Sequence, residues 1–243
     1  MGTGVLLKLA AAAIVATALA DARAAAGPDL PAVEKLVLER TNDFRREQGL
    51  NALAANAPLE RAARYFAEYM ARTDRYGHHA DGAEPADRAT RHGYEWCQVS
   101  ENISYQYTSA SFATAELAER YVGGWKRSAG HRRNMLDRHD VHAAVAVAHS
   151  AKTGRYYAVQ MFGRPKSMSV EFHVTNRTRE TASYRMAEKT YSLEPGSTRI
   201  HQQCATEELT LRSPRATGAQ IAAHPKDGDR VEIVRQAGGL ALR

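Results

Sequence analysis

The sequence predicts an α+β protein in which a three-layer α/β/α sandwich is followed by a small all-β, sandwich-like module. Three observations lead to this fold class: apolar residues at helical spacing in the first half of the chain, two alternating segments at its middle, and only short alternating segments thereafter. The 243 residues, 44% of them hydrophobic, suffice for a folded core. We place the boundary at Arg164-Pro165, which gives domains of residues 27–164 and 165–243.

The helices of the first domain are predicted from their apolar faces and their end signals. Asp29 can cap a first helix that Gly49 ends, and a second helix begins at Pro58. Two further helices are predicted at 87–92 and 114–125. The apolar faces of the first two consist of Val33, Leu36, Val37 and Phe44, and of Leu59, Ala62, Ala63, Phe66 and Met70.

Strands are predicted from alternation of apolar and polar residues. Residues 95–107 are strand-like near their middle, and 141–149 and 155–163 form a hairpin through the glycine-containing link at 150–154. We expect the helices of the first domain to flank a small antiparallel sheet. Beyond the boundary, Glu194-Pro195-Gly196 marks a turn between short strands typical of a small β-sandwich. Those strands are predicted at 167–175, 182–186, 189–193, 198–202, 208–212, 230–234 and 240–243.

Residues 1–26 have the composition of a secretory signal peptide. An apolar run of 12 residues, LAAAAIVATALA, precedes the small residues Ala24-Ala25-Ala26. The run is short for a membrane span, although an uncleaved anchor is the alternative. No later segment approaches a span. We therefore expect a secreted or periplasmic protein with no transmembrane segment in its mature chain.

Charge and cysteine content restrict the partners. The 33 basic and 27 acidic residues give a net charge of +6, but the excess is spread along the chain. A nucleic-acid-binding protein usually concentrates basic residues in one patch, so we expect no nucleic acid partner.

An exported chain permits a disulfide between Cys97 and Cys204, and two unpaired thiols are the alternative.

Four stretches carry polar side chains at or near the ends of predicted elements, where functional sites tend to be built. They are residues 76–82, 100–104, 114–125 and 128–136. Together they resemble the CAP superfamily of cysteine-rich secretory proteins, antigen 5 and pathogenesis-related 1 proteins, above all its bacterial secreted SCP-domain type. The resemblance covers about residues 33–163 and rests on six motifs in order. They are NDFR at 42–45, Tyr76-Gly77-His78, the ADR-to-GY segment at 86–94, SENI at 100–103, WKRSAGHRRNML at 125–136 and VQMFG at 159–163.

The resemblance implies the three-layer fold and a cleft that holds two histidines and one or two glutamates. By motif, the histidines are His78 and His131 and the first glutamate is Glu101. Ser128 stands where the family has its second glutamate, so this chain lacks it. The loop after His78 is also one residue shorter than is usual, which leaves His79 as an alternative to His78. Asn134 completes the cleft set and is expected to tie loops together by hydrogen bonds.

The chemistry of this set leaves alternatives open. His78 and His131 could hold a divalent metal such as zinc, loosely and only when neutral, or they could belong to a structural polar network. A metal-assisted peptide or ester hydrolase would use His78, Glu101 and His131. Ser128 could serve as a nucleophile for His131, but no GxSxG motif accompanies it. We assign no catalytic residue.

The sequence therefore favours a secreted CAP-like protein that binds a ligand or partner and does not turn it over. The resemblance allows lipid, polysaccharide or protein ligands and does not choose among them. The alternatives are the hydrolase and a cell-envelope interaction protein that acts through the C-terminal β-module.

Overall fold

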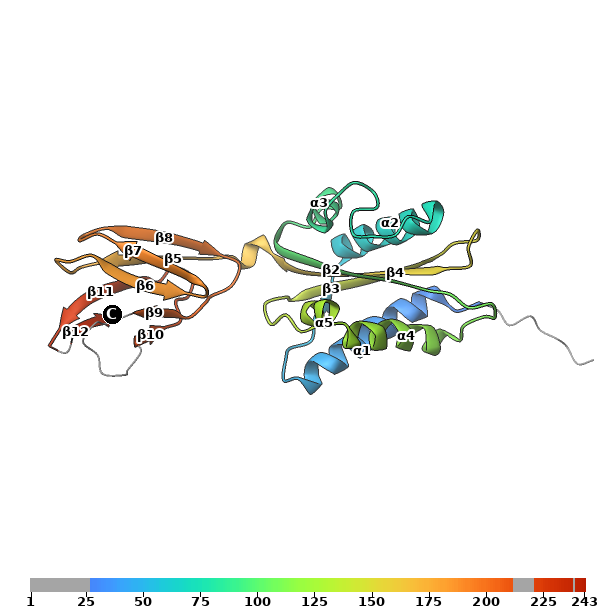
Figure 1. The fold of residues 1–243 in the computed structure, drawn as a ribbon, viewed down its shortest axis with the longest axis horizontal. Coiled ribbons are helices and arrows are strands. Elements are labelled where there is room, and N and C mark those ends of the chain that lie inside the picture. The colour runs from blue at the N-terminus through green and yellow to red at the C-terminus, as the bar shows by residue number, and fades with distance from the viewer. Residues whose placement is uncertain (1–26, 212–220, 238) are drawn as a thin grey trace, which may run out of the picture.

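The computed structural model describes residues 27–211, 221–237 and 239–243. The predicted signal peptide lies outside these ranges. Within them, helices and mixed sheets form an α+β fold, and a second β-sheet region follows the first domain, which confirms the predicted fold class (Figure 1). In the same ranges no helix has the length and apolar character needed to cross a membrane.

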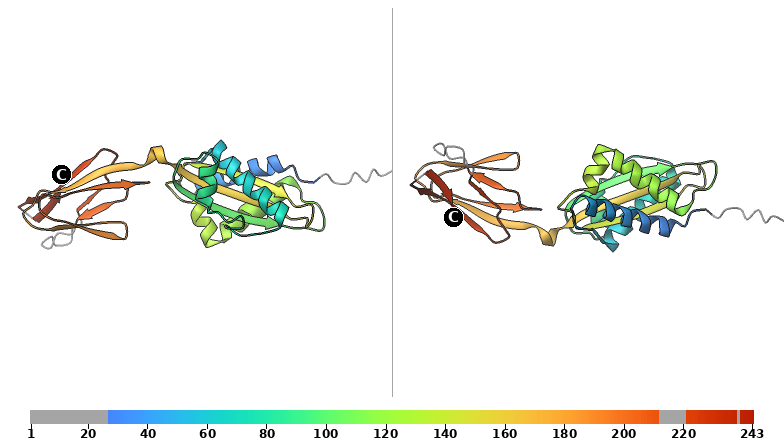
Figure 2. Two further views of the ribbon diagram at one scale, coloured as in Figure 1. Left: turned by 90° about the horizontal axis from the view of Figure 1, so that it is seen from above. Right: turned by 90° about the horizontal axis from the view of Figure 1, so that it is seen from below.

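Helices cover both faces of the first sheet, as Figure 2 shows. One face carries α1 (Leu30–Glu47), α4 (Thr114–Arg127) and α5 (Ala129–Met135), and the other carries α2 (Ala57–Thr73) and α3 (Pro85–Arg91). The predicted caps form where expected, because the Asp29 carboxylate accepts the Ala32 amide and Gly49 adopts a φ of 72° after α1. The segment 129–135 is a separate short helix that the sequence did not predict.

The first sheet has the strand order β1-β3-β4-β2. The strands β2 (Trp96–Gln106), β3 (His142–His149) and β4 (Tyr156–Pro165) pair antiparallel, as predicted. The two-residue strand β1 (Ala54–Ala55) pairs parallel with β3, so the sheet is mixed and the purely antiparallel prediction is wrong at this edge. Two alanines carry no pattern from which such a strand could be predicted.

Alternation along β3 supplies both cores of the first domain. Val145 and Val147 pack against the α1, α4 and α5 face, whereas Ala146 and Ala148 pack against the α2 face. The strand is therefore buried on both sides, which explains its nearly continuous apolar sequence.

The C-terminal region contains two four-stranded sheets around a third core. One sheet has the order β10-β9-β6-β7 and the other β12-β11-β5-β8. All seven predicted strands are present, and β10 was missed. The strands are β5 (Val170–Asn176), β6 (Ala182–Met186), β7 (Lys189–Leu193), β8 (Thr198–Gln203), β9 (Leu209–Leu211), β10 (Ile221–Ala223), β11 (Arg230–Gln236) and β12 (Gly239–Leu242).

Two covalent links join the two regions. The chain passes from β4 into β5 through the short 3-10 helix η1 (Lys166–Met168). Cys97 in β2 and Cys204 after β8 form a disulfide with a Cα–Cα distance of 5.3 Å, which confirms the paired alternative. The first two cores draw on residues up to Phe162 and the third on residues from Val170 onward. This separation supports the domain boundary that we propose after Arg164.

Loss of the disulfide should loosen the β-module. The bond spans 107 residues of sequence, and a cross-link of this reach typically stabilises a fold by about 2–4 kcal/mol. We expect the variant with both Cys97→Ser and Cys204→Ser to melt at lower temperature and to be cleaved faster by trypsin at the exposed Lys166. A reductant should lower the melting temperature of the wild type and speed its cleavage by trypsin. It should leave both quantities unchanged in the variant. Equal cleavage rates in both proteins would contradict the expectation.

Candidate functional site

Glu101 lies near the middle of β2, and its carboxylate is almost fully buried, with 1% side-chain exposure. Its Oε1 atom is 2.8 Å from His78 Nδ1. A carboxylate can only accept, so His78 Nδ1 carries the proton and donates it to Glu101. This hydrogen bond fixes the tautomer of His78 and leaves Nε2 as the nitrogen free to contact a ligand.

Arg88 of α3 holds Glu101 from the inside. Its guanidinium is fully buried and donates from Nη2 to Glu101 Oε2 at 2.9 Å and from Nη1 to Asp81 Oδ1 at 2.7 Å. The same group donates to the His78 and Ala83 carbonyls, both at 2.9 Å. It also lies 3.6 Å from the centre of the Phe66 ring. Arg88 therefore connects the loop that carries His78 to the strand that carries Glu101.

Asn134 and the His131 carbonyl of α5 contact β2 at Glu101 and Asn102. Asn134 Nδ2 donates to the Glu101 carbonyl at 3.1 Å and to Asn102 Oδ1 at 2.9 Å, and Asn102 Nδ2 donates to the His131 carbonyl at 3.2 Å. Burial lowers the pKa of His131, and the nearby charge of His78 lowers it further. The His131 imidazole is thus close enough to His78 to feel its charge, and Asn134 ties α5 to β2.

His79 occupies a different place. Its Nε2 atom is 2.8 Å from Glu84 Oε2, and both side chains are largely exposed. The structure therefore brings His78, and not its neighbour, against Glu101. Gly77, the residue before His78, adopts a φ of 144°, which suits glycine.

A sequence model described as the cysteine-rich secretory protein family, CAP, matches residues 38–162, just over half of the chain. The protein belongs to the CAP family. Two curated relatives come from Bacillus subtilis strain 168. The uncharacterized protein YkwD is 28% identical over 134 residues, and the uncharacterized membrane protein YlbC is 30% identical over 115. These matches cover 55% and 47% of this chain but 48% and 31% of the relatives, so the chain spans about half or less of their length.

Solved structures of bacterial proteins overlap with the CAP domain. An outer surface protein from Borrelia burgdorferi is 17% identical, with a TM-score of 0.47 and coverage of 53% of this chain and 90% of that one. An extracellular SCP-domain protein from Bacillus anthracis strain Ames is 22% identical, with a TM-score of 0.47 and coverage of 56% and 41%. These solved structures therefore resemble only part of this chain.

Ser128 ends α4 and begins α5 of the CAP domain, and its hydroxyl has no hydrogen-bond partner in the described ranges. No hydrogen bond to His131 prepares it as a nucleophile. The carboxylates of α4 do not replace the missing family glutamate either. Glu119 pairs with Arg40 at 3.1 Å, and Glu116 pairs with Arg120 at 2.9 Å. The first pair joins α4 to α1, and the second lies on the exposed surface of α4.

The donors of the cleft fit a complete protein-held metal site poorly. Both Glu101 oxygens accept from Arg88, and one also accepts from His78, so the carboxylate has little capacity left for a cation. Across residues 27–211, 221–237 and 239–243, no group of three or more His, Cys, Asp or Glu side chains could hold a metal. His78 Nε2 and His131 remain as two imidazole donors.

The sequence singled out the ADR segment as a motif but did not predict that Arg88 belongs to the cleft. An arginine in the last turn of a short helix usually lies in solvent. The signal that could have identified it is its spacing from Pro85, since a helix that begins at Pro85 directs Arg88 inward beside Ala89. Asn102, next to Glu101 in the SENI motif, was also missed as a link between β2 and α5.

A second polar cluster, with Asp140 buried and its partners partly buried, lies at the end of the CAP domain that carries Cys97. Gln98 Nε2 donates to Asp137 Oδ2 at 2.7 Å and to Asp140 Oδ1 at 3.3 Å. Burial and, to a smaller extent, the neighbouring Asp137 raise the pKa of Asp140 to about 7, against the lowering effects of Arg45, the Gln98 hydrogen bond and Arg164. Asp140 Oδ2 has no partner in the described residues. Asp140 is therefore a buried carboxyl that favours its neutral form.

Replacement of Arg88 should strongly destabilise the CAP domain. Arg88→Met leaves two buried carboxylates without their cation, and such losses typically cost about 3–5 kcal/mol. Denaturant unfolding followed by tryptophan fluorescence reports on this domain, because Trp96 and Trp125 both lie in it. The matched control is Arg91→Met on the exposed side of α3. A loss below about 1 kcal/mol for Arg88→Met would contradict the assigned role.

Asp140→Asn should stabilise the protein more at pH 7.5 than at pH 5. The folded state keeps the proton of Asp140 up to a pKa of about 7, whereas the unfolded chain releases it above the usual value of 3.8. Wild-type stability from this group therefore falls as pH rises from about 4 to 7, by at most about 1.4 kcal/mol per pH unit. Melting of both proteins across this range measures the difference. Asp43→Asn, at an exposed carboxylate, should show no such trend.

Proposed function

We propose that the protein binds a ligand through the cleft formed by His78, Glu101 and His131 and does not turn it over. The observation that carries this proposal is the state of Glu101, whose two oxygens are occupied by Arg88 and His78. A general base must offer a free lone pair to the proton that it removes. Glu101 instead positions His78, which leaves two imidazoles and the surrounding loops as the ligand-binding surface.

The cleft admits several ligand classes by its chemistry. His78 Nε2 and His131 can donate or accept hydrogen bonds, and His78 is partly exposed, with a side-chain exposure of 42%. Such groups suit the hydroxyl groups of a polysaccharide, the head group of a lipid or the main chain of a protein. The ligand is accordingly proposed as a lipid, polysaccharide or protein of the extracellular space.

The signal-like segment and the disulfide support export. Residues 1–26 have the signal composition described above, and Cys97 and Cys204 are paired. Disulfides persist in oxidising compartments and are rare in the cytosol. We therefore propose that the mature chain acts outside the cytoplasm, secreted or periplasmic. The β-module, fixed to β2 by the disulfide, is a second candidate contact with the cell envelope.

Hydrolysis is the alternative that the cleft supports less well. It would need His131 as base, with Glu101 orienting or activating water, or Ser128 as nucleophile. Fluorogenic peptide and ester substrates should give the same rates with wild type and with His131→Ala, because no activated nucleophile is in place. Turnover by the wild type that His131→Ala abolishes and that a chelator removes would overturn the binding proposal in favour of the metal-assisted hydrolase.

Zinc binding should be weak and should depend on both cleft histidines. Two neutral imidazoles are the donors available, so protons compete with the metal. Calorimetric titration of the wild type should give a saturable signal that is at least about tenfold weaker at pH 5.5 than at pH 7.5. His78→Ala and His131→Ala should each abolish it.

The matched control for this titration is His79→Ala, which removes an adjacent histidine that points elsewhere. It should bind zinc like the wild type. An equal signal in all four proteins, or no saturable signal in the wild type, would remove metal binding from the proposal and leave ligand binding by the cleft untouched.

A further inference from the structure

The outer edge of the first sheet at β3 is only partly covered. β1 pairs with β3 at His142 and Ala143 and then turns into α2. Four residues further along, a pair of side chains occupies the place of a strand. Glu34 Oε1 accepts the Val147 amide at 2.7 Å, and Arg64, bound to Glu34 at 2.6 Å, donates to the Val147 carbonyl at 3.4 Å.

Val145 lies between these two covers. In an antiparallel pair, residues alternate between those that exchange hydrogen bonds with the partner strand and those that point away from it. The amide and carbonyl groups of Ala143 and Val147 point away from β4, because they bond β1 and the Glu34–Arg64 pair. Those of Val145, two residues from each, therefore point away from β4 as well. Its amide and carbonyl have no hydrogen-bond partner among the described residues.

The main chain of Val145 therefore presents an open stretch of sheet edge. Val145 itself is only 6% exposed, and most amides and carbonyls in native proteins are paired with protein groups or with water. A partner main chain would supply one acceptor and one donor to this open strand edge, as strand addition does.

A groove of about 330 Å³ gives access to this position. α1 contributes Glu34 and Leu38 to its walls, β1 and α2 contribute Ala55 and Glu60, and Ala143 to Val145 form its floor. This volume lies in the range of small-ligand sites. The residues that line the groove from α1 and α2 belong to the N-terminal halves of these helices, and the strand order β1-β3-β4-β2 puts this edge of the sheet opposite β2, which carries Glu101.

We propose that this groove binds a short extended peptide, whose main chain pairs with the Val145 amide and carbonyl as a continuation of β1. The gap from Ala143 to Val147 is about 13 Å at the usual rise of a strand, which fits three residues. The apolar side chains Leu38, Ala55 and Ala143 suit small apolar peptide side chains, and the main chain supplies the acceptor and the donor that Val145 lacks.

The premise is tested on the free protein by amide hydrogen exchange. The Val145 amide should exchange faster than that of Ala146, which belongs to a hydrogen-bonded pair with Val159 in β4. Equal protection of the two amides would overturn the inference, because it would show that Val145 is already paired.

Binding is tested by titrating the full chain with the capped peptide acetyl-Ala-Val-Ala-amide while amide chemical shifts are recorded. The Val145 amide should shift saturably. The same peptide with N-methylated amides should bind at least about fivefold more weakly, since it loses a hydrogen bond donor. N-methylacetamide alone should bind more weakly than the peptide. If the two bound with equal affinity, the site would recognise a single amide group and not a peptide, and the proposal would be overturned.

Two neighbouring strand residues provide matched variants. Ala55 lines the groove and Ala54 does not, and both are exposed, so neither substitution should unfold the protein. Ala55→Phe should abolish the saturable shift of Val145, whereas Ala54→Phe should change the affinity by less than about twofold. Equal binding by both variants, or an N-methylated peptide that binds as well as the parent, would overturn the proposal.

Discussion

The candidate site of this CAP protein depends on one buried guanidinium. Arg88 bonds two carboxylates, Asp81 and Glu101, and the His78 carbonyl, and its flat face rests on Phe66 of α2. These contacts join α3, the loop before it, α2 and β2. Without a cation at this point, burial of the two carboxylates would be prohibitively unfavourable, so the position of His78 follows from that of Arg88. The cleft is thus built from the inside, from charge pairing outward to the histidines.

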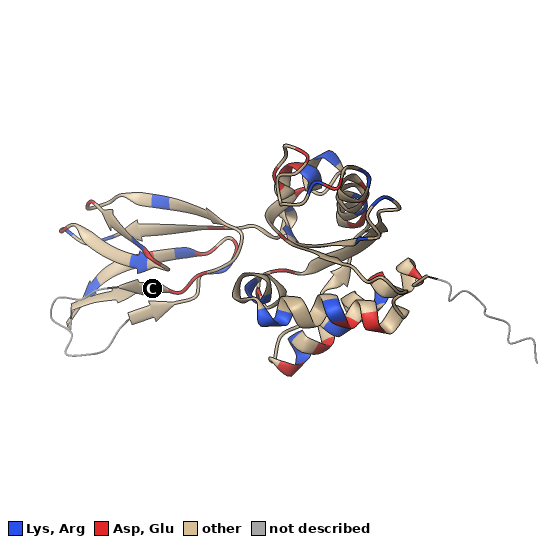
Figure 3. Ribbon diagram, turned by 45° about the vertical axis from the view of Figure 1, so that its right-hand side comes forward, with Lys and Arg blue, Asp and Glu red and all other residues tan. Residues whose placement is uncertain are grey.

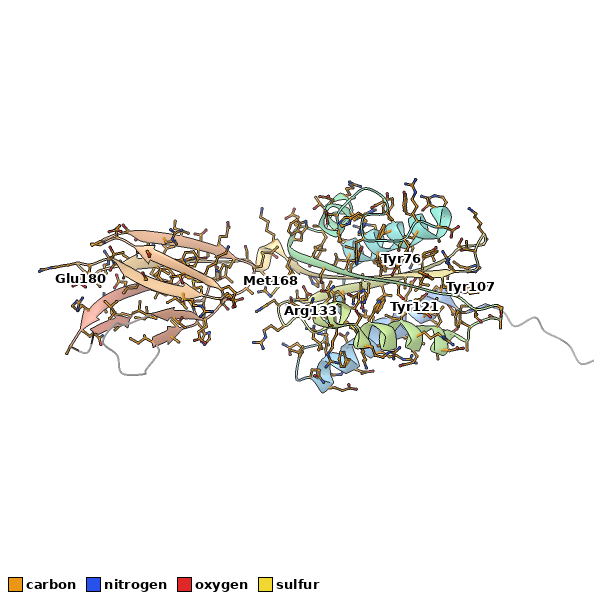
Figure 4. The ribbon with its side chains drawn as sticks, in the orientation of Figure 1. Tyr76, Tyr107, Tyr121, Arg133, Met168 and Glu180 are labelled. Atoms are coloured by element: carbon orange, nitrogen blue, oxygen red, sulfur yellow. A yellow bond between two sulfur atoms is a disulfide. The ribbon has the colours of Figure 1, made fainter. Side chains whose placement is uncertain are left out.

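The same residues that shape the cleft also close an edge of the sheet. β2 is an edge strand, and exposed edges invite pairing with other chains. Asn134 bonds the outward carbonyl of Glu101, and the Tyr76 hydroxyl and the Trp125 indole bond that of Ile103. Figure 4 shows Tyr76 on the α2 side of the sheet. Side chains replace a neighbouring strand here, so the loops around the cleft are held by the main chain of β2 itself.

Electrostatic interactions on the surface are weaker than those in the cleft. Figure 3 shows basic and acidic residues interspersed along α1 and α4, and several of them pair, as Lys35 does with Glu39. Pairs of this kind at exposed sites contribute little to stability. The buried groups Arg88 and Asp140 have the larger effects because water does not screen them.

Much of the fold follows from local patterns, and the cleft follows only in part. The caps at Asp29 and Gly49 and the alternation of 141–149 and 155–163 depend on near neighbours in the sequence, so they could be predicted. The choice of His78 over His79 depends on which side of one turn faces a distant strand. The role of Arg88 depends on carboxylates 7 and 13 residues away, whose spacing has no periodic signature. The parallel strand β1 is set by contact with β3 alone.

The disulfide has a mechanical consequence. Cys97 lies on the same strand as Glu101, four residues before it, and the other connection between the two regions leaves from β4, the neighbour of β2. Two connections on adjacent strands permit the β-module to swing about the line that joins them, but they prevent it from spinning about a single tether. A pull on the module is shared between β2 and β4 and acts along strands that pair over ten registered positions, from Trp96–Pro165 to Gln106–Tyr156. Because Trp96 and Pro165 face each other at one end of this pair, the load enters both strands at the same end and pulls them together, so it does not slide β2 past β4.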